Sequence, residues 1–92
     1  DLKKEEATVD TTFLINKAKT FFKRKGLFLN WIELNKLENL QKINTLSMIA
    51  PIANEEKQKL LEAISLKEKI KVLENIIDFY LHEVDFNTQT IQ

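Results

Sequence analysis

The stretch SLKEKIKVLENIIDFYLHEV, residues 65–84, decides the fold of this chain. Its apolar residues recur at the i, i+3, i+4, i+7 spacing of one helix face, at Leu66, Ile70, Leu73, Ile77, Leu81 and Val84. Four more apolar residues widen this face beyond a single stripe, namely Val72, Ile76, Phe79 and Tyr80. A helix with so wide an apolar face has to be covered on several sides. We therefore expect residues 65–84 to form a long central helix, covered by the shorter elements before it.

Local start and stop signals divide the preceding residues into shorter helices. Asp10 is a good N-cap, and Gly26 follows three cationic residues, which is typical of a helix C-terminus, so a first helix is expected over about residues 11–25. Asn30 opens an N-x-x-E capping box for a short second helix. We expect Asn39 to cap a third helix, which Pro51 ends because proline cannot extend the hydrogen-bond ladder.

A fourth short helix is expected from Asn54, where Glu55 and Glu56 suit the helix dipole, and a capping box from Ser65 to Glu68 starts the long helix. The apolar residues expected to face inward from the second to fourth helices are Leu34, Leu37, Leu40, Ile43, Leu46, Ile49, Ala50, Leu60, Leu61 and Ile64. No run alternates apolar and polar residues between turn signals. The sequence therefore predicts an all-α bundle of four to five helices with a long C-terminal helix.

The two ends of the chain differ in composition from the middle. Residues 1–9 are charged and nearly devoid of large apolar side chains, which predicts a flexible linker. Apolar periodicity is lost after Asp85, so the last residues are expected to fray. We expect one domain, a helical bundle over residues 10–86, followed by a disordered tail at residues 87–92.

Composition excludes several classes of function. The chain has no cysteine, so disulfides, thiolate metal sites and cysteine nucleophiles are excluded. Its 14 basic and 14 acidic residues are interspersed, which argues against nucleic-acid binding through a basic face. No apolar run has the length of a membrane span, and no signal-peptide pattern is present, so we expect a cytoplasmic location. The abundance of lysine, isoleucine and asparagine is typical of an AT-rich bacterial genome.

Motifs for catalysis are mostly absent from the sequence. With a single glycine there is no phosphate-binding loop or dinucleotide fingerprint. Asp78 and His82, at i and i+4, could form half of a metal site or an acid–base pair. The simpler interpretation is a solvated histidine near the end of a helix. We expect no enzymatic activity, no cofactor and no metal.

Aromatic and aliphatic residues at the connectors are the candidates for a protein-binding surface. In so small a domain most apolar side chains are needed in the core. The residues expected to stay partly exposed are Phe28, Trp31 and Ile52, which lie between helices, and Tyr80, whose hydroxyl can reach the surface. Exposed anchors of this kind carry binding energy in peptide-accepting grooves.

Two segments resemble a known family. Residues 44–52, NTLSMIAPI, followed by EKQKLLEA at residues 56–63, are similar to the helical part of the Lon protease N-terminal, substrate-binding domain. Upstream, Gly26-Leu27 and Asn30-Trp31 resemble stand-alone bacterial proteins that carry this domain without the protease. The resemblance covers residues 9–81.

The resemblance implies a larger architecture and a protein-binding role. It implies a PUA-like β domain upstream of Asp1 and binding of unfolded or damaged client proteins, with a protease or an adaptor as a further partner. The chain has no GxxxxGK[ST] ATPase loop and no serine–lysine protease domain. We therefore expect a non-enzymatic protein-binding module. The alternative is a structural or dimerisation bundle that supports the β domain and has no client site of its own.

Overall fold

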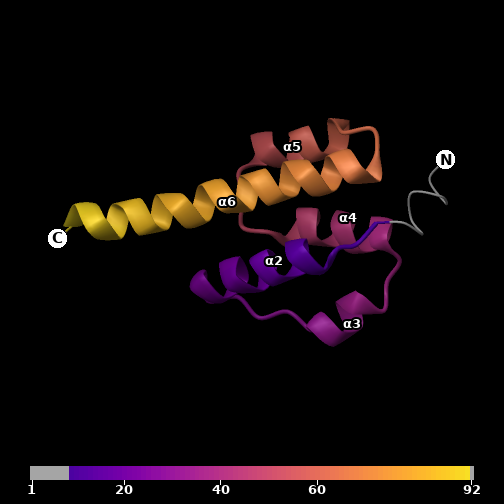
Figure 1. Cartoon of the computed structure of the whole chain (residues 1–92), viewed down its shortest axis with the longest axis horizontal. Helices are drawn as coiled ribbons and strands as arrows, with labels where there is room; N and C mark the ends of the chain where they lie inside the picture. Colours follow the sequence, from indigo (N-terminus) through magenta and orange to yellow (C-terminus); the bar gives the residue numbers. More distant parts are fainter. Residues whose placement is uncertain (1–8, 92) are drawn as a thin grey trace.

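Five helices form the part of the chain that this computed structural model describes, residues 9–91, with side chains described for residues 9–82. They are α2 (Thr12–Arg24), α3 (Trp31–Asn35), α4 (Asn39–Ile49), α5 (Asn54–Glu62) and α6 (Leu66–Ile91). No strand occurs within residues 9–91. The predicted all-α bundle with a long C-terminal helix is therefore confirmed (Figure 1). The linker predicted at residues 1–9 lies, apart from Val9, outside the described residues.

Most of the predicted helix signals act as expected. Gly26 adopts a φ of 71° directly after α2, a conformation that side chains with a Cβ rarely adopt. The Asn30 side chain accepts a hydrogen bond from the backbone N–H of Glu33, with 3.2 Å between Oδ1 and N. The Ser65 hydroxyl likewise accepts from the N–H of Glu68 at 3.1 Å. These local interactions fix where α2 ends and where α3 and α6 begin.

The predicted N-caps of α2 and α4 are both wrong by one residue. Thr11, not Asp10, occupies the N-cap position of α2, and the Thr11 side chain makes no capping hydrogen bond there. Asp10 Oδ1 accepts a hydrogen bond from the N–H of Thr12 at 2.9 Å, and this backbone hydrogen bond lowers the pKa of Asp10 below its usual value. The prediction of Asn39 as an N-cap is wrong, because Glu38 occupies that position. The Asn39 amide instead donates to the carbonyl of Val9 at 3.1 Å. This contact ties the segment before α2 to the start of α4.

α6 lies at the centre of the bundle, and α2, α4 and α5 each pack against it (Figure 1). Leu73 and Ile77 of α6 are almost completely shielded from solvent. α2 runs parallel to α6, and the Phe21 ring on α2 packs edge-on against the Tyr80 ring with 5.5 Å between centroids. The wide apolar face of α6 is thus covered from several sides, as its sequence requires.

The backbone of α6 stays helical beyond the point where the sequence predicts fraying. Apolar periodicity is lost after Asp85, yet the helix continues to Ile91 and extends past the other helices (Figure 1). No glycine or proline interrupts residues 85–91, and each added residue of an existing helix gains one more hydrogen bond. Periodicity alone therefore placed the end of this helix too early.

The inward faces of the short helices were only partly predicted. Leu60 is 2% exposed, but its neighbour Leu61 is 73% exposed. Leu37, Ile49 and Ile64 were also expected in the core and are exposed. α5 has nine residues and contacts α4 and α6, so its contacting side can bury only one of the two adjacent leucines.

These two leucines make a matched pair for a stability measurement. Leu60→Ala should lower the free energy of unfolding by about 2–5 kcal/mol, since it leaves a cavity in the core. Leu61→Ala should change it by less than about 0.5 kcal/mol, because the side chain is already solvated. Urea unfolding followed by circular dichroism measures both values. Equal losses in the two variants would contradict the described orientation of α5.

Candidate functional site

The connector between α2 and α3 holds the most exposed aromatic residue of the described chain. The N–H of Leu27 donates to the carbonyl of Phe22 at 2.9 Å, which closes the last turn of α2 as the chain reverses at Gly26. Phe28 follows this turn, and its side chain is fully exposed to solvent. The sequence places Phe28 among the exposed candidates, and this expectation of exposure is confirmed.

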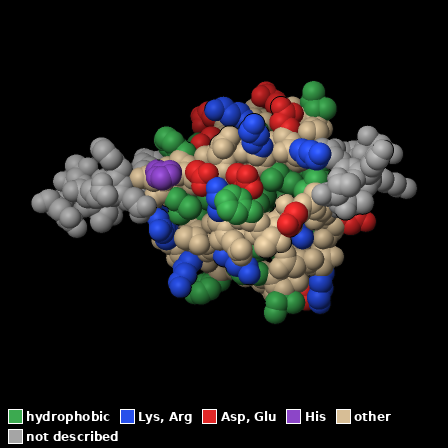
Figure 2. All heavy atoms as spheres, in the orientation of Figure 1, with side chains coloured by type: hydrophobic (Ala, Val, Ile, Leu, Met, Phe, Trp, Pro, Cys, Tyr) green, Lys and Arg blue, Asp and Glu red, His purple; other side chains and the backbone are tan. Residues whose placement is uncertain are grey.

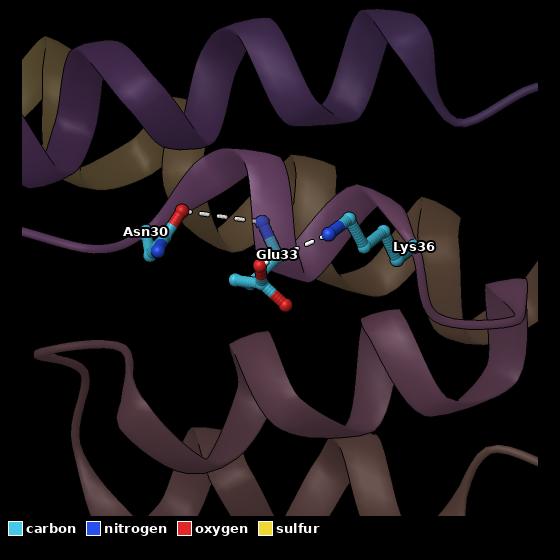
Figure 3. A network of polar contacts seen from close by, with 3 residues as sticks. All are labelled: Asn30, Glu33 and Lys36. Carbon is cyan, nitrogen blue, oxygen red and sulfur yellow. Dashed lines mark hydrogen bonds and ion pairs between the residues drawn. The ribbon is translucent and has the colours of Figure 1, made fainter.

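Trp31 is held beside Phe28 by the cap of α3. Figure 3 shows the Asn30 side chain bonded to the Glu33 N–H, and Lys36 Nζ bonded to the Glu33 carboxylate at 3.1 Å. Because this network fixes the first turn of α3, it also fixes the indole of Trp31 at the helix start. The indole is half-buried and packs edge-on against Phe22, with 5.5 Å between ring centroids.

Phe28 and Trp31 line one groove, which we call the α2–α3 groove. Its volume is about 470 Å³, and its walls are formed by Lys19, Phe22, Lys23, Gly26, Leu27, Phe28, Leu29 and Trp31. Lysines are the only charged residues in this lining. Figure 2 shows hydrophobic and basic side chains next to one another at the C-terminal end of α2. The groove therefore combines an apolar floor with cationic groups.

Tyr80 and Ile52, the other two candidates, do not belong to this groove. The Tyr80 hydroxyl donates to Glu56 Oε1 at 2.5 Å and accepts from the backbone N–H of Ala53 at 3.0 Å, so it links α6 to the start of α5. The expectation that Ile52 is partly exposed is wrong. A tight turn, in which the N–H of Ile52 donates to the carbonyl of Ala50 at 2.8 Å, folds its side chain into the core.

Asp78 and His82 do not come together with further ligands. The Asp78 carboxylate pairs with Lys17 of α2, with 2.8 Å between Nζ and Oδ2, and His82 is exposed. Within the described part of the chain, no group of three or more histidine, cysteine, aspartate or glutamate residues could hold a metal ion. The arrangement of Asp78 is that of an interhelical ion pair.

A second groove was missed by the sequence analysis. It has a volume of about 400 Å³ and is lined by Asn44, Ser47, Met48, Lys57, Leu60, Leu61 and Lys69. Met48 and Leu61, on α4 and α5, are both largely exposed there. The sequence feature that indicates this groove is the pair of adjacent leucines, Leu60 and Leu61. Two neighbouring residues of a helix cannot both face the core, so one of them has to lie at the surface.

Comparisons with known proteins give no assignment. No protein-family model matches the chain, and neither the curated proteins nor the solved structures searched contain a significant match. None of the helices described here is long and apolar enough to cross a membrane.

The role of Tyr80 can be tested by removing its hydroxyl. Tyr80→Phe should lower the free energy of unfolding by about 0.5–1.5 kcal/mol, because a hydrogen bond to Glu56 is lost while the ring keeps its contact with Phe21. Glu56 still accepts from the N–H of Ala53, so no backbone donor is stranded. Urea unfolding of the variant gives the value. An unchanged stability would show that the link between α6 and α5 contributes nothing.

Proposed function

We propose that this chain is a non-enzymatic protein-binding module that accepts apolar segments of unfolded or damaged client proteins in the α2–α3 groove. The observation that carries this proposal is the fully exposed Phe28 beside the half-buried Trp31, in a groove whose other apolar walls are Phe22, Leu27 and Leu29. Large exposed aromatic side chains next to a concave apolar surface are typical of binding sites.

The chemistry of the groove suits a segment with apolar side chains. Covering Phe28 and the exposed edge of Trp31 would remove apolar surface from water at about 25 cal/mol per Å². Trp31 is held by its contact with Phe22, so little side-chain freedom is lost when a client binds. Lys19 and Lys23 can meet carbonyl groups or carboxylates of the client.

The resemblance to the helical part of the Lon N-terminal domain supports the same function. It adds the expected context, which is a bacterial cytoplasm, an upstream PUA-like β domain, and a protease or an adaptor that receives the client. The segments that carry the resemblance lie in two places. EKQKLLE forms most of α5, while Gly26-Leu27 and Trp31 line the groove itself.

Binding to an unfolded chain tests this function. The probe is a reduced and alkylated tryptophan-free protein that stays unfolded, and its native form is the negative control. Trp31 is the only tryptophan, so its indole N–H gives one resonance that reports on the groove. We expect this resonance to shift with the unfolded probe only. Phe28→Ala should weaken binding roughly fivefold or more, since removal of an anchoring aromatic residue costs above 1 kcal/mol.

The matched control for this experiment is Phe13→Ala. Phe13 is also exposed, at 64%, but it lies at the start of α2 and does not line the groove. Its truncation should leave the affinity unchanged. An indole resonance that does not respond to the unfolded probe, or equal losses in both variants, would refute client binding in this groove.

A structural or dimerisation bundle is the second candidate function, and Phe79 favours it. This residue is 62% exposed on α6, whereas Val72 and Tyr80 on the same helix are half-buried. A large aromatic residue left open on the central helix is expected where a further domain or a second copy covers it.

Self-association of the chain tests this alternative. If α6 forms a homodimer through this residue, sedimentation equilibrium should give a dimer that Phe79→Ser shifts toward the monomer by at least about fivefold in Kd. Phe13→Ser, at a similarly exposed phenylalanine, should have no effect. A wild-type chain that stays monomeric at all concentrations would rule out the homodimer.

A further inference from the structure

A polar hollow lies where the start of α2 meets α3 and α4. Its volume is about 380 Å³, and its polar lining consists of Thr11, Thr12, Asn16, Lys19, Asn35 and Lys42. All six side chains can donate hydrogen bonds, and no aspartate or glutamate belongs to the lining. Of these residues only Lys19 also lines the α2–α3 groove. The hollow is thus a concave surface of donors with two cationic groups.

Lys42 is the unusual residue of this hollow. It lies in the first half of α4 and is only 8% exposed, although lysine is almost never fully buried without a partner. Its ammonium donates to the Thr11 hydroxyl at 3.4 Å, which is longer than the usual 2.7–3.2 Å of such bonds. Among the described residues no carboxylate forms an ion pair with it. Within residues 9–82 this buried ammonium has one long hydrogen bond and no counter-charge.

We propose that this hollow binds a phosphate group, with the Lys42 ammonium as its main cation. A phosphate has several strong acceptor oxygens, which match the clustered hydroxyl, amide and ammonium donors. Lys19, whose ammonium lies 5.9 Å from the centroid of the Trp31 ring, supplies the second positive charge of the lining. Thr11 is bonded to Lys42 and lines the hollow, so bound phosphate would lie within reach of both groups.

Asp10 directly precedes Thr11 of this site in the sequence, and its negative charge is expected to weaken phosphate binding. Its carboxylate accepts from the N–H of Thr12 and is exposed outside the lining. Asp10 would repel bound phosphate through its negative charge, since it lies one residue before Thr11. Asp10→Asn keeps an acceptor at this position and removes that charge, so it should tighten phosphate binding.

The main experiment compares thermal unfolding in sodium phosphate and in sodium chloride of equal ionic strength and pH. Wild type should unfold at a higher temperature in phosphate, because a ligand that binds only the folded state stabilises it. In Lys42→Met this difference should vanish, with affinity lowered by about tenfold or more. Lys71→Met, which removes an exposed lysine outside the hollow, should behave as wild type does.

Direct titration keeps the proposal testable if Lys42→Met does not fold. Inorganic phosphate added to the ¹⁵N-labelled wild-type chain should shift the amides of Thr11 and Thr12 with saturation. A parallel titration with O-phosphoserine distinguishes a site for free phosphate from one that also admits a phosphate monoester. Phe28→Ala should bind phosphate as wild type does, because Phe28 does not line the hollow. The phosphate result is therefore independent of whether the α2–α3 groove binds a client.

Two results would overturn the phosphate site. The first is the same thermal gain from phosphate in wild type and in Lys42→Met, which would mean a general salt effect. The second is the absence of saturating shifts at Thr11 and Thr12 with both phosphate compounds. Either result would leave Lys42 as a lysine whose carbon chain fills space in the core and whose ammonium is hydrated.

Discussion

The whole bundle depends on the burial of one face of α6 by helices from both halves of the chain. Leu73 and Ile77 are almost fully shielded, and each such side chain stabilises the fold by about 1.5–3 kcal/mol. A domain of this size is stable by only about 5–15 kcal/mol in total. α2 supplies the opposing surface through Leu14 and Phe21, which are equally buried. The short helices could not form a core without α6, because each is too short to be stable alone.

Polar contacts fix how the surrounding helices lie on α6. The ion pair between Lys17 and Asp78 is partly exposed, so it selects an orientation of α2 more than it adds stability. On the other side, the Tyr80 hydroxyl bonds to Glu56 at the start of α5. Both contacts engage the same short segment of α6. The orientation of α2 and α5 on α6 is therefore set by Asp78 and Tyr80. The apolar pattern alone would place Asp78 in solvent and Tyr80 in the core, and would give neither of them this role.

The end of α2 and the starts of α3 and α6 were predictable because their causes are local. Asn30, Ser65 and Gly26 act within three or four residues of their own positions, so a single sequence contains the whole interaction. The direction in which a short helix faces is different. Leu60 and Leu61 have the same local preference, and only the positions of α4 and α6 decide which of them is buried.

In the candidate sites, too, features with a local cause were predictable and features that depend on tertiary packing were not. The exposure of Phe28 follows from its place in a connector after Gly26, and the sequence is sufficient to predict it. The burial of Ile52 depends on a turn that folds it back on the core, and the buried ammonium of Lys42 on α4 contacts Thr11, the residue before α2. Thr11 lies 31 positions from Lys42 in the sequence, and the core that receives Ile52 is built from several helices. Neither could be derived from spacing or composition.

The pairing of α2 with α6 also determines the order in which the fold can form. Lys17 and Asp78 are separated by 61 positions, so their contact closes a loop that contains most of the domain. Closing so long a loop costs chain entropy before any core contact offsets it. During synthesis α2, α4 and α5 leave the ribosome before α6, the helix against which all three pack. The core that these helices share with α6 can therefore close only once α6 has been translated, and until then their apolar faces lack the surface that covers them in the folded domain.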